Sequence, residues 1–284
     1  MLVRRFWATI PDVDTTHEPT PERFQLGSAA AEAYEAQFVP ALFAQWVAPL
    51  LDLAGVRAGQ RVLDVACGTG VVARAAADRT GREADVIGVD LNEAMLAVAR
   101  RIRPGIGWQA SDVTDLPFPG GTFDAVLCQM ALMFFPDRHA AMAEIARVVA
   151  PGGVAAIAVP ASLDDQEAFA PFVELASAQA GPAAAALLST YFTCGDLDEL
   201  TRLASAAGLH DVASRTITGR YRFGSIDAAV TTEVESTPLI DRIDTQVYQR
   251  IRDGARELWQ PFVTPTGALD APFTARLVVG RKPR

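Results

Sequence analysis

One short stretch decides the fold of this chain: residues 62–76, which read VLDVACGTGVVARAA. The continuous apolar run RVLDVAC predicts a buried strand, and the segment GVVARAAADR that follows it is typical of a helix. Small residues join the two elements. Glycine-rich turns between a parallel strand and a helix bind nucleotides, so this turn is the first candidate for a binding site.

Outward from this stretch, strands and helices alternate. Further strands are predicted for ADVIGVDL, IGWQASDV, FDAVLCQMAL and GVAAIAVP, and helices for NEAMLAVARRI, with Asn92 as its cap, and HAAMAEIARVV. Such alternation favours a doubly wound, Rossmann-like α/β sheet with helices on both faces.

The flanking regions follow other patterns. Residues 28–53 are helical by their apolar spacing, and Pro40 and Pro49 are expected to divide them into short helices. Farther along, DLDELTRLASAAG predicts a helix, HDVASRTITGRYRF a strand, and FTARLVVGRK a last strand at the sheet edge. We expect a single domain over 1–284, in which residues 1–23 are loosely ordered. Its expected parts are an N-terminal helical cap (1–55), a cofactor-binding core (56–160) and two helical lid insertions (161–195 and 225–262).

Composition excludes several classes of protein. The 284 residues carry a formal net charge of −9, which disfavours nucleic acid as a partner. The three cysteines, at 67, 128 and 194, lack metal-ligand spacing, so we predict no metal site and a reduced, cytoplasmic setting. The apolar run near the N-terminus is too short for a signal peptide, and VLCQMALMFF is too short to span a membrane.

The turn at 64–70 does not fit a phosphate. If Ala66 and Gly68 stand for the first two glycines of the dinucleotide fingerprint G-x-G-x-x-G, the third falls on Val71. Asp64 would also repel a pyrophosphate, and the P-loop motif fails because the turn has no lysine.

Three acids at successive strand ends suit a nucleoside with a cationic tail instead. Asp64 can accept a hydrogen bond from an ammonium group, and Asp90 can accept from both ribose hydroxyls. Asp112 can accept from the exocyclic amine of adenine, with the Val113 N–H facing a ring nitrogen. Any one of these acids alone could be a helix cap or a turn residue. As an ordered set they predict S-adenosylmethionine rather than NAD or ATP.

These motifs closely resemble the class I S-adenosylmethionine-dependent methyltransferases, in particular the small-molecule branch with the ubiquinone and menaquinone methyltransferases. The resemblance covers about residues 28–160. It rests on VLDVACGTG, VIGVDLNEAMLAVAR, ASDVTDLPFPGGTFDAVLCQMALMFFPD and EIARVVAPGGVAAIAVP. It implies a seven-stranded sheet in the order 3-2-1-4-5-7-6, with strand 7 antiparallel.

The resemblance also implies roles for individual residues. It places Asp64, Gly68 and Gly70 around the methionine moiety, with Ala66 where the family has its first glycine. It places Asp90 and Leu91 at the ribose and Asp112 and Val113 at the adenine. Gln129 would lie near the transferred methyl group. Tyr34 resembles a tyrosine that closes over the cofactor, although an aromatic residue at helical spacing is also typical of a core.

No residue stands out as a catalytic base. His17 lies in the N-terminal tail, His210 begins a strand at the far end of the sheet, and His139 opens a helix after FFPD, where a capping or surface role competes with a catalytic one. The lid segments carry aromatic residues that suit a flat, apolar acceptor or simply pack the lid: Phe169, Phe172, Tyr191, Phe192, Tyr248, Trp259 and Phe262. The apolar stripe between Ile240 and Trp259 leaves a homodimer open.

The sequence therefore predicts methyl transfer from S-adenosylmethionine to a small, hydrophobic or aromatic metabolite, at oxygen in preference to carbon or nitrogen. Two alternatives remain at this point. One is an NAD(P)-dependent oxidoreductase, and the other is a catalytically silent protein that binds S-adenosylmethionine.

Overall fold

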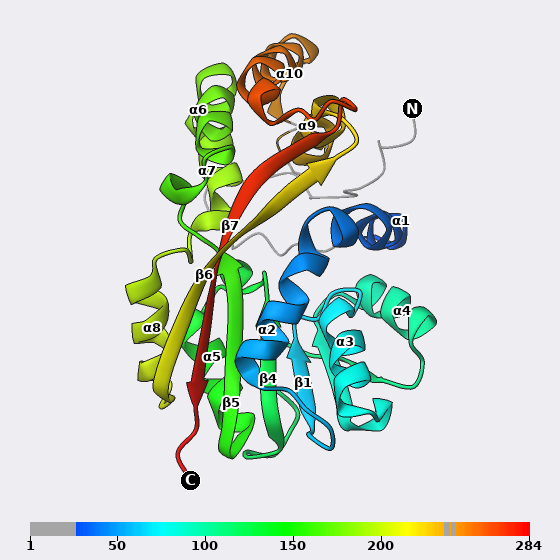
Figure 1. Cartoon of the computed structure of the whole chain (residues 1–284), viewed down its shortest axis with the longest axis vertical. Helices are drawn as coiled ribbons and strands as arrows, with labels where there is room; N and C mark the ends of the chain where they lie inside the picture. Colours follow the sequence, from blue (N-terminus) through cyan, green and yellow to red (C-terminus); the bar gives the residue numbers. More distant parts are fainter. Residues whose placement is uncertain (1–26, 236–238, 240–241) are drawn as a thin grey trace, which may run out of the picture.

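A seven-stranded mixed sheet forms the centre of the molecule (Figure 1). The computed structural model describes residues 27–235, 239 and 242–284, so the expectation for residues 1–23 lies outside the described residues. The strands are β1 (Val62–Val65), β2 (Val86–Asp90), β3 (Gly107–Ala110), β4 (Phe123–Gln129), β5 (Val149–Pro160), β6 (His210–Phe223) and β7 (Leu269–Arg281). Their order is β3-β2-β1-β4-β5-β7-β6, with β7 antiparallel to both of its neighbours, which confirms the predicted topology.

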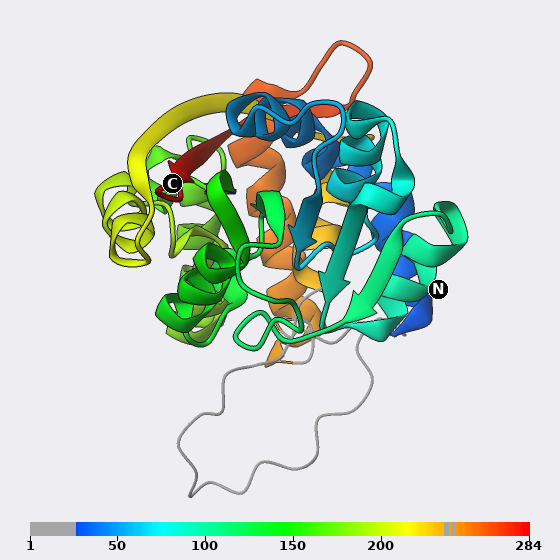
Figure 2. The same cartoon turned by 90° about the horizontal axis from the view of Figure 1, so that it is seen from below.

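Helices cover both faces of this sheet (Figure 2). The α-helices are α1 (Ser28–Ala33), α2 (Val47–Ala54), α3 (Val71–Thr80), α4 (Glu93–Ile102), α5 (Arg138–Val148), α6 (Phe169–Ala180), α7 (Pro182–Ser189), α8 (Leu197–Ala206), α9 (Ile226–Glu235) and α10 (Thr245–Trp259). Alternate strand residues face opposite layers. In β4, Leu127 joins the core under α2 and α3, whereas Val126 joins the core under α5 and α8.

The N-terminal helical region is continuous, so the expectation that Pro40 and Pro49 divide it is wrong. The ten-residue π-helix η1 (Tyr34–Phe43) and the 3₁₀ turn η2 (Ala44–Trp46) link α1 to α2. Pro40 lies inside η1, where the widened turns shift the hydrogen-bond register that a proline would otherwise interrupt. Pro49 lies in the first turn of α2, where the missing N–H costs least.

By length and composition the run Ser28–Ala54 is also able to cross a membrane. Core helices of globular proteins meet the same criterion, and in this chain Trp46, Leu50 and Leu51 of the run are buried against the sheet.

The last strand is not at the sheet edge as expected, because β7 lies between β5 and β6. In this interior position β7 is hydrogen-bonded along both of its edges, to β5 and to β6. Along the strand its residues alternate between buried and half-buried. Residues 269–274 continue past the end of β5 and pair with β6. Helices α6, α7, α9 and α10 gather around this extension, beyond the carboxyl ends of the parallel strands (Figure 1).

The described part of the Ile240–Trp259 stripe faces inward. Ile251 and Trp259 are buried, and Trp259 stacks on Phe172 of α6 with ring centroids 4.7 Å apart. These two side chains therefore join α10 to α6; Ile240 lies outside the described residues.

Candidate functional site

The turn after β1 is shaped by three residues with positive φ angles. They are Ala66 at 53°, Gly68 at 55° and Gly70 at 87°. Ala66 adopts a conformation that favours glycine, at a cost of about 1–2 kcal/mol. A β-carbon on Gly68 would meet the Tyr34 ring at 3.8 Å, whereas one on Gly70 would overlap the Trp108 ring. Gly68 is thus open toward a ligand, and Gly70 is required by packing.

One cavity of about 360 Å³ lies over this turn and the carboxyl ends of β1, β2 and β4. Nine of the ten residues assigned to cofactor binding from the sequence line it: Tyr34, Asp64, Ala66, Gly68, Asp90, Leu91, Asp112, Val113 and Gln129. Gly70 does not. The topology therefore brings together residues that are up to 95 positions apart in the chain.

Each of the three acids also has a local structural role. Asp64 is 1% exposed, and its Oδ2 accepts from the N–H of Ala73 in the first turn of α3 at 2.9 Å. Asp112 accepts from the N–H and the hydroxyl of Thr114. These contacts give Asp64 and Asp112 local structural roles and leave both carboxylates at the cavity wall.

Asp90 has the most connected carboxylate. Its Oδ2 accepts from the Gly68 N–H at 2.8 Å, and its Oδ1 accepts from the Asn92 N–H at 2.8 Å. The Leu91 N–H also hydrogen-bonds this carboxylate, and its two oxygens together retain lone-pair capacity for a further donor. Asn92 in turn caps α4, as expected from the sequence, by accepting from Ala94 and Met95.

Burial makes the two inner carboxylates hard to ionise. It raises the pKa of Asp64 to about 8, against the lowering effect of the Ala73 N–H. Burial likewise raises the pKa of Asp90, opposed by the N–H groups of Asn92 and Gly68. A ligand with positive charge near these groups would favour their ionised forms.

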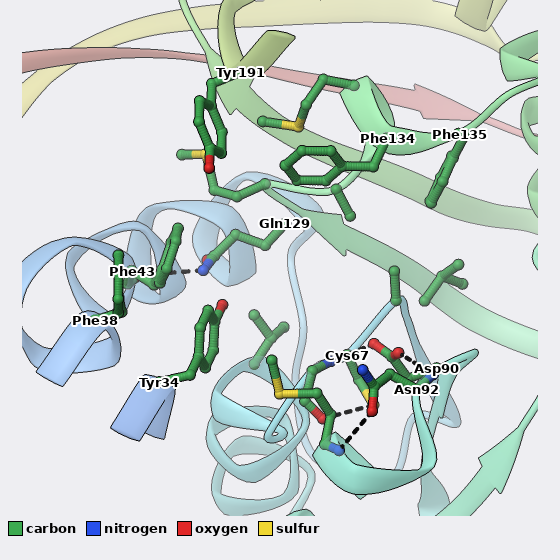
Figure 3. A pocket seen from close by; sticks show the side chains of 18 of the residues that line it. Tyr34, Phe38, Phe43, Cys67, Asp90, Asn92, Gln129, Phe134, Phe135 and Tyr191 are labelled. Carbon is green, nitrogen blue, oxygen red and sulfur yellow. Dashed lines mark hydrogen bonds between the residues drawn. The ribbon is translucent and has the colours of Figure 1, made fainter. Parts of the chain in front are cut away.

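Tyr34, from helix η1, and Gln129, from the end of β4, both point into the cavity (Figure 3). Tyr34 begins the π-helix and stacks on Phe43 with ring centroids 5.3 Å apart. Gln129 ends β4, and its Nε2 donates to the carbonyl of Phe43 at 3.1 Å. That bond leaves the buried Oε1 of Gln129 without a protein partner in the described structure.

Several aromatic rings line the part of the cavity formed by β7 and the segments beyond β4 and β5. Among the lid residues named from the sequence, Phe169, Tyr191 and Phe192 line the cavity, whereas Phe172 and Trp259 are buried behind it. Tyr191 meets Phe134 edge to face at 5.6 Å (Figure 3). The wall therefore offers flat apolar surfaces of the kind that bind ring systems.

The charged residues in the described cavity wall are all acidic: Asp64, Asp90, Asp112 and Glu233. Sequence reasoning missed Glu233, because an acid within a helical segment carries no local signal of a site. His139 is exposed at the start of α5 and does not line the cavity, and His210 is exposed at the amino end of β6. His17 lies outside the described residues.

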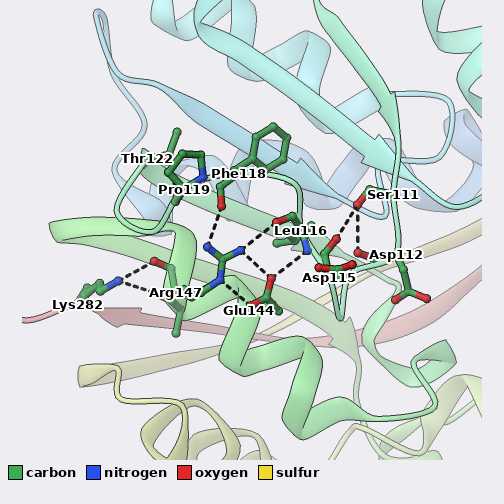
Figure 4. A network of polar contacts seen from close by, with 11 residues as sticks. Ser111, Asp112, Asp115, Leu116, Phe118, Pro119, Thr122, Glu144, Arg147 and Lys282 are labelled. Atoms are coloured by element: carbon green, nitrogen blue, oxygen red, sulfur yellow. Dashed lines mark hydrogen bonds and ion pairs between the residues drawn. The ribbon is translucent and has the colours of Figure 1, made fainter.

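A polar network holds the loop that carries Asp112 (Figure 4). Arg147 of α5 donates to the carbonyls of Leu116 and Phe118, at 2.9 and 2.7 Å, and Glu144 accepts from the Leu116 N–H. Arg147 also pairs with Glu144, which lowers the pKa of that carboxyl. These bonds fix the loop after β3 to helix α5. They thereby position Asp112 and Val113 in the cavity wall.

Comparison with known proteins gives a consistent result. Residues 62–153 match the family described as a methyltransferase domain. A demethylmenaquinone methyltransferase from Beutenbergia cavernae is 40% identical over 108 residues, which is 38% of this chain and 44% of the relative. The nocamycin O-methyltransferase of Saccharothrix syringae is 39% identical over 109 residues, covering 37% and 39% of the two chains. The chain spans about half the length of the curated relatives it matches.

Solved structures show the same fold. Phosphoethanolamine N-methyltransferase 2 from Haemonchus contortus, in complex with S-adenosyl-L-methionine, superposes with a TM-score of 0.59 at 21% identity, covering 92% of this chain and 59% of that one. The strand order and the match over 62–153 both agree with a methyltransferase domain. Residues 62–153 thus match a methyltransferase domain, the sheet has the fold of solved methyltransferases, and about 38% of the chain is similar in sequence to demethylmenaquinone and ubiquinone/menaquinone methyltransferases.

Proposed function

We propose that this chain transfers a methyl group from S-adenosylmethionine to a small, uncharged, apolar ring compound, at an oxygen atom. The observation that carries the proposal is the division of one cavity into two kinds of wall. Carboxylates and a glycine turn stand at the strand ends, and aromatic rings stand under the lid helices. A cationic nucleoside fits the first wall, and a quinone-like or phenolic ring fits the second.

The residues present fit the cofactor. Gly68 leaves room for close approach, Asp90 keeps acceptor capacity for ribose hydroxyls, and the buried Gln129 Oε1 needs a donor. We assign cofactor binding to the nine lining residues given above. Gly70 acts through its packing on Trp108. The bound cofactor supplies an activated methyl group on a sulfonium, and the chain has to orient the acceptor and exclude water.

The acidic wall disfavours the dehydrogenase alternative. A dinucleotide would bring a diphosphate next to Asp64 and Asp90, and the described wall carries no lysine or arginine to neutralise it. For the same reason we infer that the acceptor is not a carboxylate or a phosphate. The relatives include enzymes named for C-methylation and for O-methylation. Their names do not decide between carbon and oxygen, and we propose oxygen.

We infer that the described residues act as one domain, in which 161–195 and 225–262 form lids over the core at 56–160. Three free, buried cysteines suit a reduced, cytoplasmic setting.

Isothermal titration with S-adenosylhomocysteine and with NADH tests the cofactor. We expect binding of the first and none of the second; the reverse result would overturn the proposal. Methyl-labelled S-adenosylmethionine with a panel of phenols and quinols then tests transfer. Tight cofactor binding with no transfer to any member would favour the catalytically silent alternative.

A further inference from the structure

A half-buried acid, Glu233, stands in the lid part of the cavity, away from the acids of the strand ends. Glu233 lies in the last turns of α9 and lines the cavity with its neighbour Thr232. Its Oε1 accepts a hydrogen bond of 2.8 Å from the hydroxyl of Tyr221 on β6. An ionisable side chain in the wall of a largely apolar cavity is a candidate for a functional group.

The surroundings of Glu233 fix its place and leave it weakly acidic. Tyr221 is 1% exposed and packs edge to face on Phe169 with ring centroids 4.8 Å apart, so the donor to Glu233 is held rigidly. Burial raises the pKa of Glu233 to about 7, although the Tyr221 hydrogen bond lowers it. The described titratable groups that face it are Tyr221 and Tyr191, and its charge contributes to the raised pKa of Tyr191.

We propose that the Glu233 carboxylate is the general base of the reaction and takes the proton from a hydroxyl group of the methyl acceptor. This inference rests on the proposed function and narrows it to acceptors with an acidic hydroxyl, phenols or enols. Tyr221 is a positioning residue, because it acts through Glu233.

The proton balance is simple. As the acceptor oxygen bonds to the methyl carbon, the carbon–sulfur bond breaks with its electron pair passing to the sulfonium sulfur, and the hydroxyl proton passes to Glu233. A base with a pKa near 7 is about half ionised at neutral pH and still takes up a proton readily, which is the property general-base catalysis needs. Of the histidines weighed for this role, His139 and His210 do not line the cavity, and His17 lies outside the described residues.

The test compares two probes that differ only in the hydroxyl proton: 2-naphthol and 2-methoxynaphthalene. Both are added to the full chain saturated with S-adenosylhomocysteine, and affinity is measured by calorimetry between about pH 6 and 8.5, where a phenol of pKa about 10 stays neutral. We expect naphthol to bind about tenfold more tightly at the upper end, because the charged Glu233 carboxylate accepts a hydrogen bond from its hydroxyl group. That preference should decline as the pH falls through about 7 and Glu233 is protonated.

Variants separate the proposal from a structural role. In Glu233→Gln the preference should shrink and lose its pH dependence, with unchanged affinity for S-adenosylhomocysteine. In Tyr221→Phe the midpoint should move to higher pH, because the hydrogen bond that lowers the Glu233 pKa is gone. Glu257→Gln, at an exposed position of α10, is the matched control and should behave as wild type. Wherever a phenol is methylated, Glu233→Gln should reduce kcat about 10²–10⁴-fold.

Three results would overturn the assignment of Glu233. They are equal affinity for both probes in the wild type, a wild-type pH profile in Glu233→Gln, and tighter binding of 2-naphthylmethylamine than of naphthol, which would make Glu233 an ammonium anchor. If S-adenosylhomocysteine binds but neither naphthalene probe does, the acceptor class is wrong while the cofactor site stands. If S-adenosylhomocysteine does not bind either, the proposed function itself fails.

Discussion

The Asp90 carboxylate at the end of β2 accepts a hydrogen bond of 2.8 Å from the backbone N–H of Gly68, in the turn after β1. The left-handed conformation of Gly68, at φ 55°, turns that N–H toward the neighbouring strand end. One bond therefore ties the glycine turn to the acid proposed to hold the ribose. The geometry of the cofactor site is fixed by the protein's own contacts, before any ligand contributes.

The first prediction concerns this acid. Asp90→Ala removes the acceptor for the Gly68 N–H and the proposed acceptor for the ribose, so affinity for S-adenosylhomocysteine should fall about tenfold or more. Isothermal titration measures the loss. Asp198→Asn, at an exposed position of α8, is the matched control and should bind as wild type. Unchanged affinity in Asp90→Ala would refute the ribose assignment.

The second prediction separates backbone strain from steric overlap at the glycine turn. Gly70 and Gly81 stand at the two ends of α3, and both have left-handed φ angles, 87° and 78°. A β-carbon on Gly81 meets nothing within 4 Å, whereas one on Gly70 overlaps the Trp108 ring. Gly81→Ala should lower the free energy of unfolding by about 1 kcal/mol, and Gly70→Ala by about 1–3 kcal/mol more. Urea denaturation measures both values, and equal losses would show that Trp108 does not restrict position 70.

The third prediction is a pH dependence of stability. The folded pKa of Asp64, about 8, lies above its ordinary value of 3.8, because burial disfavours the charge. The folded state therefore holds the proton more tightly than the unfolded state, and the stabilising contribution of this group, complete at low pH, is lost as the pH rises from about 4 to 8. In Asp64→Asn, whose amide oxygen still accepts from Ala73, this loss should be absent.

The difference between the two proteins is measured by urea denaturation at several pH values without ligand. The unfolding free energy of wild type, relative to Asp64→Asn, should decrease by on the order of a few kcal/mol over that range. Parallel pH profiles would mean that Asp64 ionises normally in the folded protein.

The fourth prediction concerns the helix that carries Glu233. Asp227, near the start of α9, pairs with Arg252 and Arg256 of α10 at 2.8 Å, and these two cations hold its pKa below the ordinary value. Asp227→Asn should increase hydrogen exchange of the α9 amides, while global stability changes by less than about 1 kcal/mol. High salt should have the same effect on wild type.

Asp253→Asn gives the matched comparison, because Asp253 pairs with Arg256 within α10 alone. Its α9 amides should exchange at the wild-type rate. Equal protection of α9 in wild type and Asp227→Asn would show that other contacts hold the lid.

Elements with local signals were predictable, and elements placed by distant contacts were not. The apolar runs and the cap at Asn92 located the strands and α4 correctly. The interruption expected at Pro40 was wrong, because a π-helix accommodates the proline within a helix that packs on the sheet. The edge position expected for β7 was also wrong, since the order of strands depends on pairing between segments far apart in the chain. Glu233 was missed because Tyr221 and the cavity, not its sequence neighbours, make it unusual.

The sequence by itself determined the alternating sheet, the glycine turn and the acids at its strand ends, since each depends on residues within a few positions of one another. Only the tertiary structure decided that Gly70 serves packing, that Gln129 and Tyr34 face one cavity, and that a lid acid reaches it. Those properties arise from burial and contact between remote segments, which no local pattern of residues encodes.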